Sequence, residues 1–199
     1  MATDTQATAP ALALYRLTVK QYEKMIDADV FPRGAHVELL GGLLVEKMTK
    51  NDPHDVIVAE LGEVFRRLLP AGWSVREEKS LRLGRYWRPE PDLTVVRGRH
   101  REYYRRTPRA EDLALVVEVA NTSYAKDRGV LWRRFAASRI VTYWIVDVNE
   151  PRIEVYSRPS GRGNAAKYLD CTIHGAEDEV PLIVEGREVG RFPVRDLLP

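Results

Sequence analysis

The longest run of regularly spaced apolar side chains follows Asp52-Pro53. Its apolar positions recur every three or four residues, at Ile57, Leu61, Val64, Phe65 and Leu68. This spacing predicts an amphipathic helix that buries one stripe of side chains. Asp52 suits the cap position and Pro53 the first helical position, while Pro70-Ala-Gly72 is expected to end the helix.

Shorter patterns predict the remaining elements. Gly41-Gly42 between two apolar runs is typical of a tight β-hairpin, with strands near 36–40 and 43–48. Further strands are expected at 73–83, 92–96, 114–120, 141–147 and 152–157, followed by short edge strands up to Leu198. Helices are expected at 19–26, where Thr18 and Gln21 have capping-box spacing, and at 127–137. The mixture predicts an α/β (α+β) domain in which helices flank a mixed β-sheet, with an N-terminal hairpin and C-terminal antiparallel strands.

Two carboxylates interrupt the apolar strands. Asp92 begins one strand, and Glu118 lies inside the run Leu115-Val-Val-Glu-Val119. A buried charge is costly unless it is paired or binds a cation. If the two strands are neighbours, both side chains reach the same end and, with the carbonyl of Val119, offer the oxygen ligands that Mg²⁺ prefers. The alternative is that Asp92 caps a turn and Glu118 pairs with an arginine.

Length and composition limit the class of protein. The chain has 199 residues, of which 44% are hydrophobic and 30% charged. These values fit one globular domain over 13–199 after a flexible tail over 1–12. The balance of 31 basic against 29 acidic side chains does not decide whether nucleic acid is bound. A single cysteine, Cys171, and the lack of a membrane span or secretory signal lead us to expect a cytoplasmic protein.

The basic residues are unevenly distributed. Arginines and tyrosines crowd into the segment directly after the Asp92 strand, at Arg97, Arg99, Arg101, Tyr103, Tyr104, Arg105, Arg106 and Arg109. One interpretation is a solvated loop. The other is a rim beside the carboxylates that contacts the phosphates of a nucleic-acid backbone.

Other polar residues could support such a site. Glu90 shares the face of Asp92 if the strand begins early, and is either a supporting acid or, as we favour, a solvent-facing charge. Glu38 on the hairpin is either a further acid of the site or a surface charge. His54, in the first turn of the long helix, could reach a phosphate or could be a partly buried, hydrogen-bonded histidine.

The segment that follows the Glu118 strand adds two candidates. Lys126 is the one residue there able to steady an anion, and Asp127 suits an N-cap or a partner for Lys126 or Arg128. The chain contains no phosphate loop, no dinucleotide glycine fingerprint, no paired cysteines for zinc and no nucleophile elbow. These absences favour carboxylate and metal chemistry over the other classes.

Six motifs together resemble one family. They are Glu38-Leu-Leu-Gly-Gly42, His54 at the start of a helix, Pro91-Asp92-Leu, Val117-Glu118-Val, Asp127-Arg128 and Tyr143-Trp-Ile-Val-Asp147. In order and spacing they resemble the Uma-two family of restriction-type endonucleases in the PD-(D/E)XK superfamily, over roughly Leu17 to Val194. The resemblance implies a restriction-endonuclease-like core, Mg²⁺ or Mn²⁺ as cofactor, DNA as partner, and a homodimer.

The resemblance also implies roles for single residues. Asp92 and Glu118 match the two acids of the family. The family lysine matches Leu131, which can neither assist an attacking water nor stabilise charge. Three explanations stay open. Lys126 reaches the site from the start of the same helix, or Arg134 lies near the same face although arginine is a poor proton acceptor, or the chain binds metal and nucleic acid without efficient cutting.

We therefore predict a Mg²⁺-dependent endonuclease that hydrolyses DNA phosphodiester bonds with a metal-activated water. Its catalytic residues would be Asp92, Glu118 and Lys126. The alternative is a catalytically impaired nuclease-fold protein that acts as a nucleic-acid-binding or assembly module. A third possibility is a structural dimer whose sheet carboxylates are ion-paired.

Overall fold

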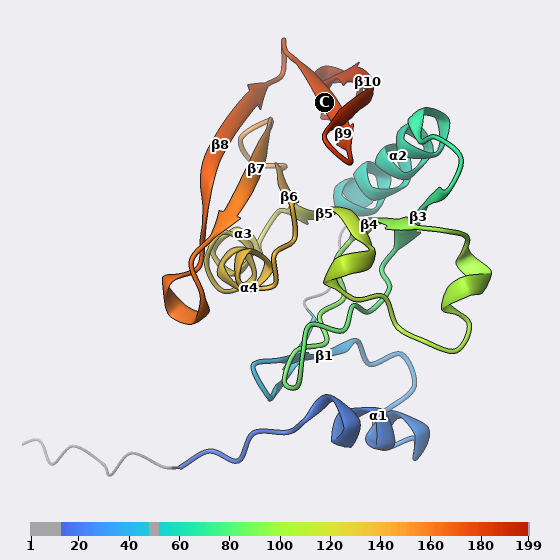
Figure 1. Ribbon diagram of the computed structural model, residues 1–199, viewed down its shortest axis with the longest axis vertical. Coiled ribbons are helices and arrows are strands. Elements are labelled where there is room, and N and C mark those ends of the chain that lie inside the picture. Colours follow the sequence, from blue (N-terminus) through green and yellow to red (C-terminus); the bar gives the residue numbers. More distant parts are fainter. Residues whose placement is uncertain (1–12, 48–51, 199) are drawn as a thin grey trace, which may run out of the picture.

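A six-stranded mixed sheet forms the centre of the molecule (Figure 1). The computed structural model describes residues 13–47 and 52–198, so the tail expected at 1–12 lies outside the described residues. The strands follow the order β3-β4-β5-β6-β7-β8. They are β3 (Trp73–Glu77), β4 (Leu93–Arg97), β5 (Leu113–Ala120), β6 (Thr142–Asp147), β7 (Arg152–Ser160) and β8 (Lys167–Gly175). Only β5 and β6 pair in parallel, which confirms the predicted mixed sheet.

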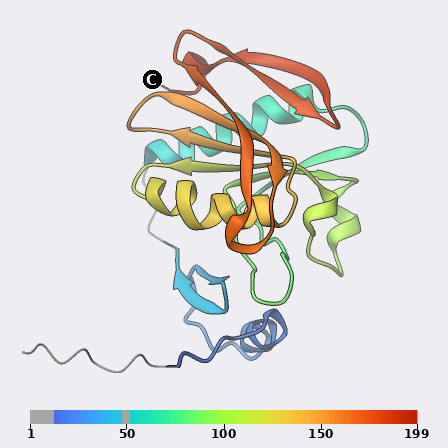
Figure 2. The same ribbon diagram turned by 60° about the vertical axis from the view of Figure 1, so that its left-hand side comes forward.

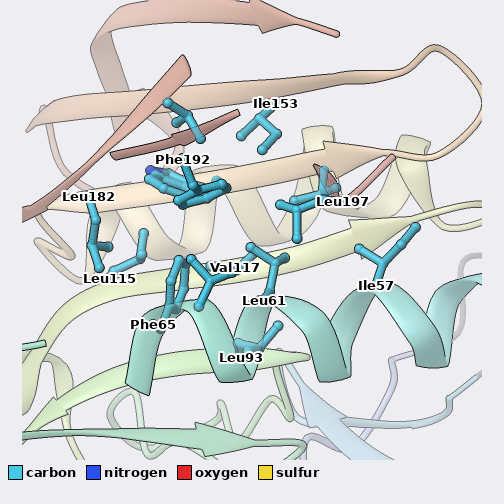
Figure 3. Packing of buried hydrophobic residues seen from close by; sticks show 14 of the residues in the cluster. Ile57, Leu61, Phe65, Leu93, Leu115, Val117, Ile153, Leu182, Phe192 and Leu197 are labelled. Atoms are coloured by element: carbon cyan, nitrogen blue, oxygen red, sulfur yellow. The ribbon is translucent and has the colours of Figure 1, made fainter. Parts of the chain in front are cut away.

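Helix α2 (Asp52–Leu68) covers one face of this sheet, together with the hairpin of β9 (Glu179–Val184) and β10 (Arg187–Pro193). The predicted stripe lies against the sheet, and Figure 3 shows Leu61 and Phe65 of α2 facing Leu93 and Val117. Phe65 also meets the ring of Trp144 edge-on, with centroids 5.6 Å apart. The amphipathic pattern therefore identified both the helix and its buried side.

The opposite face carries a helix that is longer than predicted (Figure 2). It begins as α3 (Tyr124–Lys126), continues through a π-helical turn (Asp127–Leu131) and ends as α4 (Trp132–Ala137). Asp127 is therefore buried inside the helix, and the prediction that it caps the N-terminus is wrong. Such π-helical turns are rare and frequently occur at functional sites.

The predicted strand at 73–83 is also too long, because β3 ends at Glu77. Glu78 has a φ of 51°, which breaks the extended chain. Leu81 and Leu83 are nevertheless fully buried, since the segment after β3 folds over the α4 face. The alternation of apolar and polar residues after Glu77 therefore belongs to a loop with buried leucines and not to a strand.

An N-terminal unit packs against that loop. It consists of α1 (Val19–Asp27) and a separate hairpin of β1 (Val37–Leu40) and β2 (Leu43–Glu46), close to the predicted positions. Leu39 and Arg88 pair their backbones, with Arg88 N 2.8 Å from Leu39 O. This bridge attaches the hairpin to the segment that leads into β4. Among the described residues no helix is long and apolar enough to cross a membrane.

Candidate active site

Asp92 and Glu118 lie side by side at one end of the central sheet. Leu93 of β4 is paired with Val117 of β5 in an antiparallel register, so the residue before Leu93 stands opposite the residue after Val117. Val117 faces α2, and side chains alternate along a strand, so Glu118 points to the α3–α4 face. Both carboxylates are buried. The neighbouring strands expected from the sequence are thus present.

Among residues 13–47 and 52–198, three groups hold the Asp92 carboxylate. The Lys47 ammonium donates to Oδ1 across 2.8 Å, and the backbone N–H of Val119 donates to Oδ2 across 2.9 Å. His54, in the first turn of α2, places Nε2 3.2 Å from Oδ2. The histidine is therefore buried and bonded to an acid of the site. The sequence patterns did not identify Lys47 as a site residue.

Glu38 and Glu90 lie on another side of the site, beside Lys47. The buried Glu38 carboxylate accepts from the backbone N–H of Glu90 at 2.7 Å, which links β1 to the chain entering β4. The Glu90 carbonyl accepts from Lys47 Nζ at 2.9 Å, and its carboxylate accepts from the Ser80 hydroxyl at 2.8 Å. Glu90 is half-buried, so the favoured interpretation of a solvent-facing charge is wrong.

Lys126 and Asp127 close the site from the α3–α4 face. Lys126 Nζ lies 3.6 Å from Glu38 Oε2 and 4.0 Å from Asp127 Oδ1. The other Asp127 oxygen accepts from the Ser123 hydroxyl, and the Asp127 carbonyl accepts from Tyr143. In the described part of the chain, the cluster thus combines four buried carboxylates with the ammonium groups of Lys47 and Lys126. The carboxylates are those of Glu38, Asp92, Glu118 and Asp127.

The carboxylates differ in their affinity for protons. Burial favours the neutral acid, but the hydrogen bond from His54 and the charge of Lys47 hold the pKa of Asp92 well below its usual range. Burial raises the pKa of Glu118 well above its usual range, and the neighbouring Asp92 and Asp127 raise it further. Burial also raises the pKa of Asp127 to about 6. Asp92 is therefore the ionised member of the adjacent pair.

The donor set suits a hard divalent cation. Glu38 Oε2 and Asp127 Oδ1 are buried and accept no hydrogen bond from the described residues. Carboxylate and carbonyl oxygens are the ligands that Mg²⁺ and Mn²⁺ prefer. No group of three or more His, Cys, Asp or Glu side chains within 13–47 and 52–198 is arranged as a ligand shell. The ammonium groups of Lys47 and Lys126 supply the positive charge in this arrangement.

Arg134 does not reach this cluster. Its guanidinium donates to the carbonyl of Leu83 and lies over the ring of Trp87, with Cζ 5.3 Å from the ring centroid. Leu131, which stands one turn earlier, is fully buried in the apolar cluster beneath α4. Neither side chain therefore contributes a charge to the carboxylates.

The arginine segment lies at the other end of β4. Asp92 precedes this strand and Arg97 ends it, so about 16 Å of extended chain separates them. Arg97 pairs with Glu185, and Arg106 makes a two-pronged ion pair with Asp112. The remaining predicted phosphate contacts, Arg99, Arg101 and Arg105, are exposed. The segment is thus not a rim beside the carboxylates.

Known proteins similar to this chain are putative nucleases. The model of the Uma2 family, described as "Putative restriction endonuclease", matches residues 19–191. No curated protein matches the chain. A similar solved structure is the crystal structure of "a putative nuclease belonging to DUF820" from Anabaena variabilis ATCC 29413. It is 15% identical with a TM-score of 0.64, over 91% of this chain and 97% of that one, so the likeness shows a shared fold.

Proposed function

This chain belongs to the Uma2 family, and from that membership and its carboxylate cluster we propose a divalent-metal-dependent endonuclease that hydrolyses DNA phosphodiester bonds. The observation that carries the proposal is the position of Asp92 beside Glu118, with Glu38 and Asp127 close by. Buried carboxylates in such number are costly for the fold, and the ammonium groups of Lys47 and Lys126 are fewer than the four carboxylates, so a divalent cation would add compensating charge. A function that uses a cation and a phosphate explains why they are gathered.

Asp92, Glu118 and the carbonyl of Val119 would hold Mg²⁺ or Mn²⁺. When bound, the ion supplies Lewis-acid stabilisation of the phosphate and activation of water. Hydrolysis forms a bond from the water oxygen to phosphorus and breaks the bond from phosphorus to the 3′ oxygen. The products are a 5′-phosphate and a 3′-hydroxyl, and the leaving oxygen takes up a proton.

Lys126 is the proposed charge stabiliser. Its ammonium is held between Glu38 and Asp127, at 3.6 and 4.0 Å, and its side chain is 30% exposed. An ammonium in this position faces both the carboxylates and the solvent from which a phosphate must approach. Positive charge near the reacting phosphate stabilises the charge that develops during hydrolysis.

The exposed arginines at 99, 101 and 105 are proposed to contact the DNA backbone away from the scissile bond. They follow the end of β4 that is remote from Asp92, so they would meet phosphates other than the scissile one on a duplex, which carries one charge for about each 1.7 Å of its axis. Such contacts would position the DNA without selecting a base sequence.

A second candidate function is a nuclease-derived module that binds nucleic acid without cutting it. The observation that favours it is the ion pair of Lys47 with Asp92, which already neutralises the proposed metal ligand. Leu131 at the position of the family lysine agrees with it.

A plasmid-nicking assay with Mg²⁺ or Mn²⁺ distinguishes the two. We expect the wild-type protein to nick supercoiled DNA, and Asp92→Asn or Glu118→Gln to lower the rate about 100-fold or more. Glu63→Gln is the matched control, because it removes an exposed carboxylate from α2. Unchanged cleavage by both site variants would refute the assigned site, and no cleavage by the wild-type protein would favour the binding module.

A further inference from the structure

Lys47 is fixed at the carboxylate cluster by the hairpin that carries it. It directly follows β2, and its backbone N–H donates to the carbonyl of His36 at 2.7 Å. Its ammonium donates to two acceptors from one segment, Asp92 Oδ1 at 2.8 Å and the carbonyl of Glu90 at 2.9 Å. The side chain is 10% exposed. Lys47 is thus held in one position by backbone and side chain alike.

The two lysines of the cluster differ in what they contact. Lys126 lies beside Glu38 and Asp127, at distances beyond a hydrogen bond, and is three times as exposed as Lys47. Lys47 makes a direct hydrogen bond to Asp92, the acid that β4 and β5 place beside Glu118. Of these two lysines, Lys47 is therefore the one in direct contact with a proposed metal ligand.

Position 131 cannot supply a positive charge to the carboxylates, because it holds a leucine, and this leucine is fully buried in the apolar cluster under α4. We propose that Lys47, delivered by the β1–β2 hairpin, is a second active-site ammonium beside Lys126 and the resident counter-ion of Asp92 until a divalent cation enters. The inference rests on the proposed function, because it assigns a residue to the same site. Lys126 keeps its proposed role as charge stabiliser. Lys47 differs from it because Lys47 bonds Asp92 Oδ1, an oxygen that the metal would also use.

This assignment has a consequence for metal binding. Asp92 Oδ1 bonds the Lys47 ammonium, so a divalent ion that uses this oxygen must compete with a positive charge already there. Removing the charge should strengthen binding of the metal alone. Removing it should also weaken phosphodiester cleavage, because the ammonium no longer stabilises the reacting phosphate.

Calorimetric titration with Mn²⁺ tests the competition directly. We expect Lys47→Met to bind Mn²⁺ about tenfold more tightly or better, since charges this close interact by more than the free energy of a tenfold change. Lys47→Arg should stay near the wild-type affinity. Lys79→Met is the matched control, because Lys79 lines the same hollow as Lys47 but is exposed. Unchanged or weaker Mn²⁺ binding by a folded Lys47→Met protein would overturn the inference.

Cleavage is the second measurement, made on variants whose thermal unfolding shows that they are folded. Lys47→Met should nick plasmid DNA about 100-fold more slowly than wild type, with part of the rate restored in Lys47→Arg. If Asp92→Asn abolishes cleavage while Lys47→Met cuts at the wild-type rate, the inference fails and the proposed function stands.

If the wild-type protein does not cut, the proposed function fails, and the Mn²⁺ titration still decides whether Lys47 is the counter-ion. If Lys47→Met does not fold, the charge-retaining Lys47→Arg must keep wild-type Mn²⁺ affinity, and a large change in either direction would overturn the inference.

Discussion

Lys47 and Asp92 form a buried ion pair between residues 45 positions apart in the chain, with Nζ 2.8 Å from Oδ1. The two side chains are 10% and 4% exposed. Removal of one partner from a buried pair leaves the other charge uncompensated. The pair therefore links the docking of the hairpin to the electrostatics of the site.

A double-mutant cycle measures this link. Lys47→Met and Asp92→Asn should each lower the free energy of unfolding by about 3 kcal/mol, because each leaves a buried group without its partner. The double variant should lose less than the sum, by about 2 kcal/mol, since no unpaired charge remains. Urea unfolding at neutral pH gives all four values. Additivity within about 0.5 kcal/mol would show that the two side chains do not interact.

Asp127 predicts a dependence of stability on pH. Its pKa is raised from 3.8 to about 6 in the folded protein by burial, so the native state binds this proton more tightly than the unfolded state. The contribution of Asp127 to stability is therefore present at acid pH and is lost as the pH rises from about 4 to above 6.

Asp127→Asn removes this titration. The free energy of unfolding of the variant, relative to wild type, should rise by about 2 to 3 kcal/mol between pH 3.5 and pH 7.5, because one pKa unit corresponds to about 1.4 kcal/mol. Urea unfolding at both pH values provides the comparison. A difference between variant and wild type that stays constant with pH would contradict the raised pKa.

Leu131→Lys tests whether the chain lacks an ammonium. Because Leu131 is fully buried, a lysine there should cost about 2 kcal/mol or more of stability. If Lys47 already supplies the charge, the variant should nick plasmid DNA no faster than wild type. A marked acceleration would instead mean that the missing family lysine limits the reaction.

The exposed arginines predict the salt dependence of DNA binding. Replacing Arg99, Arg101 and Arg105 by alanine should weaken binding and reduce the slope of log K against log salt by about 0.9 for each phosphate that an arginine no longer neutralises. The measurement belongs in an Asp92→Asn background, where cleavage does not interfere. Arg162→Ala, in the exposed turn before β8, is the control and should leave the slope unchanged. An unchanged slope in the triple variant would place the DNA elsewhere.

The sequence predicts those parts of the site that depend on local pattern. Asp92 and Glu118 stand in strongly apolar runs, so both the strands and the cost of a charge inside them can be recognised from the residues alone. A buried acid in a strand is nevertheless not sufficient. Glu154 in β7 is equally buried, yet Arg152 and Tyr124 hold its carboxylate at 3.2 and 2.8 Å. Asp92 is also ion-paired, to Lys47, but it stands beside a second buried acid, Glu118. The adjacent acid, and not the absence of an ion pair, separates the proposed metal site from the structural pair at Glu154.

Lys47 could not be predicted in the same way. Its position depends on the backbone bridge between Leu39 and Arg88, which brings the hairpin onto the segment before β4. That bridge joins parts of the chain about fifty residues apart, and no local pattern encodes it. The helix start at Tyr124 was missed for a related reason. In the sequence Asp127 resembles an N-cap, which placed the predicted start there, but tertiary contacts of the site bury Asp127 inside the helix.

A crystal soaked in Mn²⁺ tests most directly whether the adjacent carboxylates hold a divalent ion. We expect anomalous density between Asp92 and Glu118, with the Lys47 ammonium displaced from Asp92 Oδ1. Absence of that density, with Lys47 still bonded to Asp92, would contradict a metal-dependent reaction at this site.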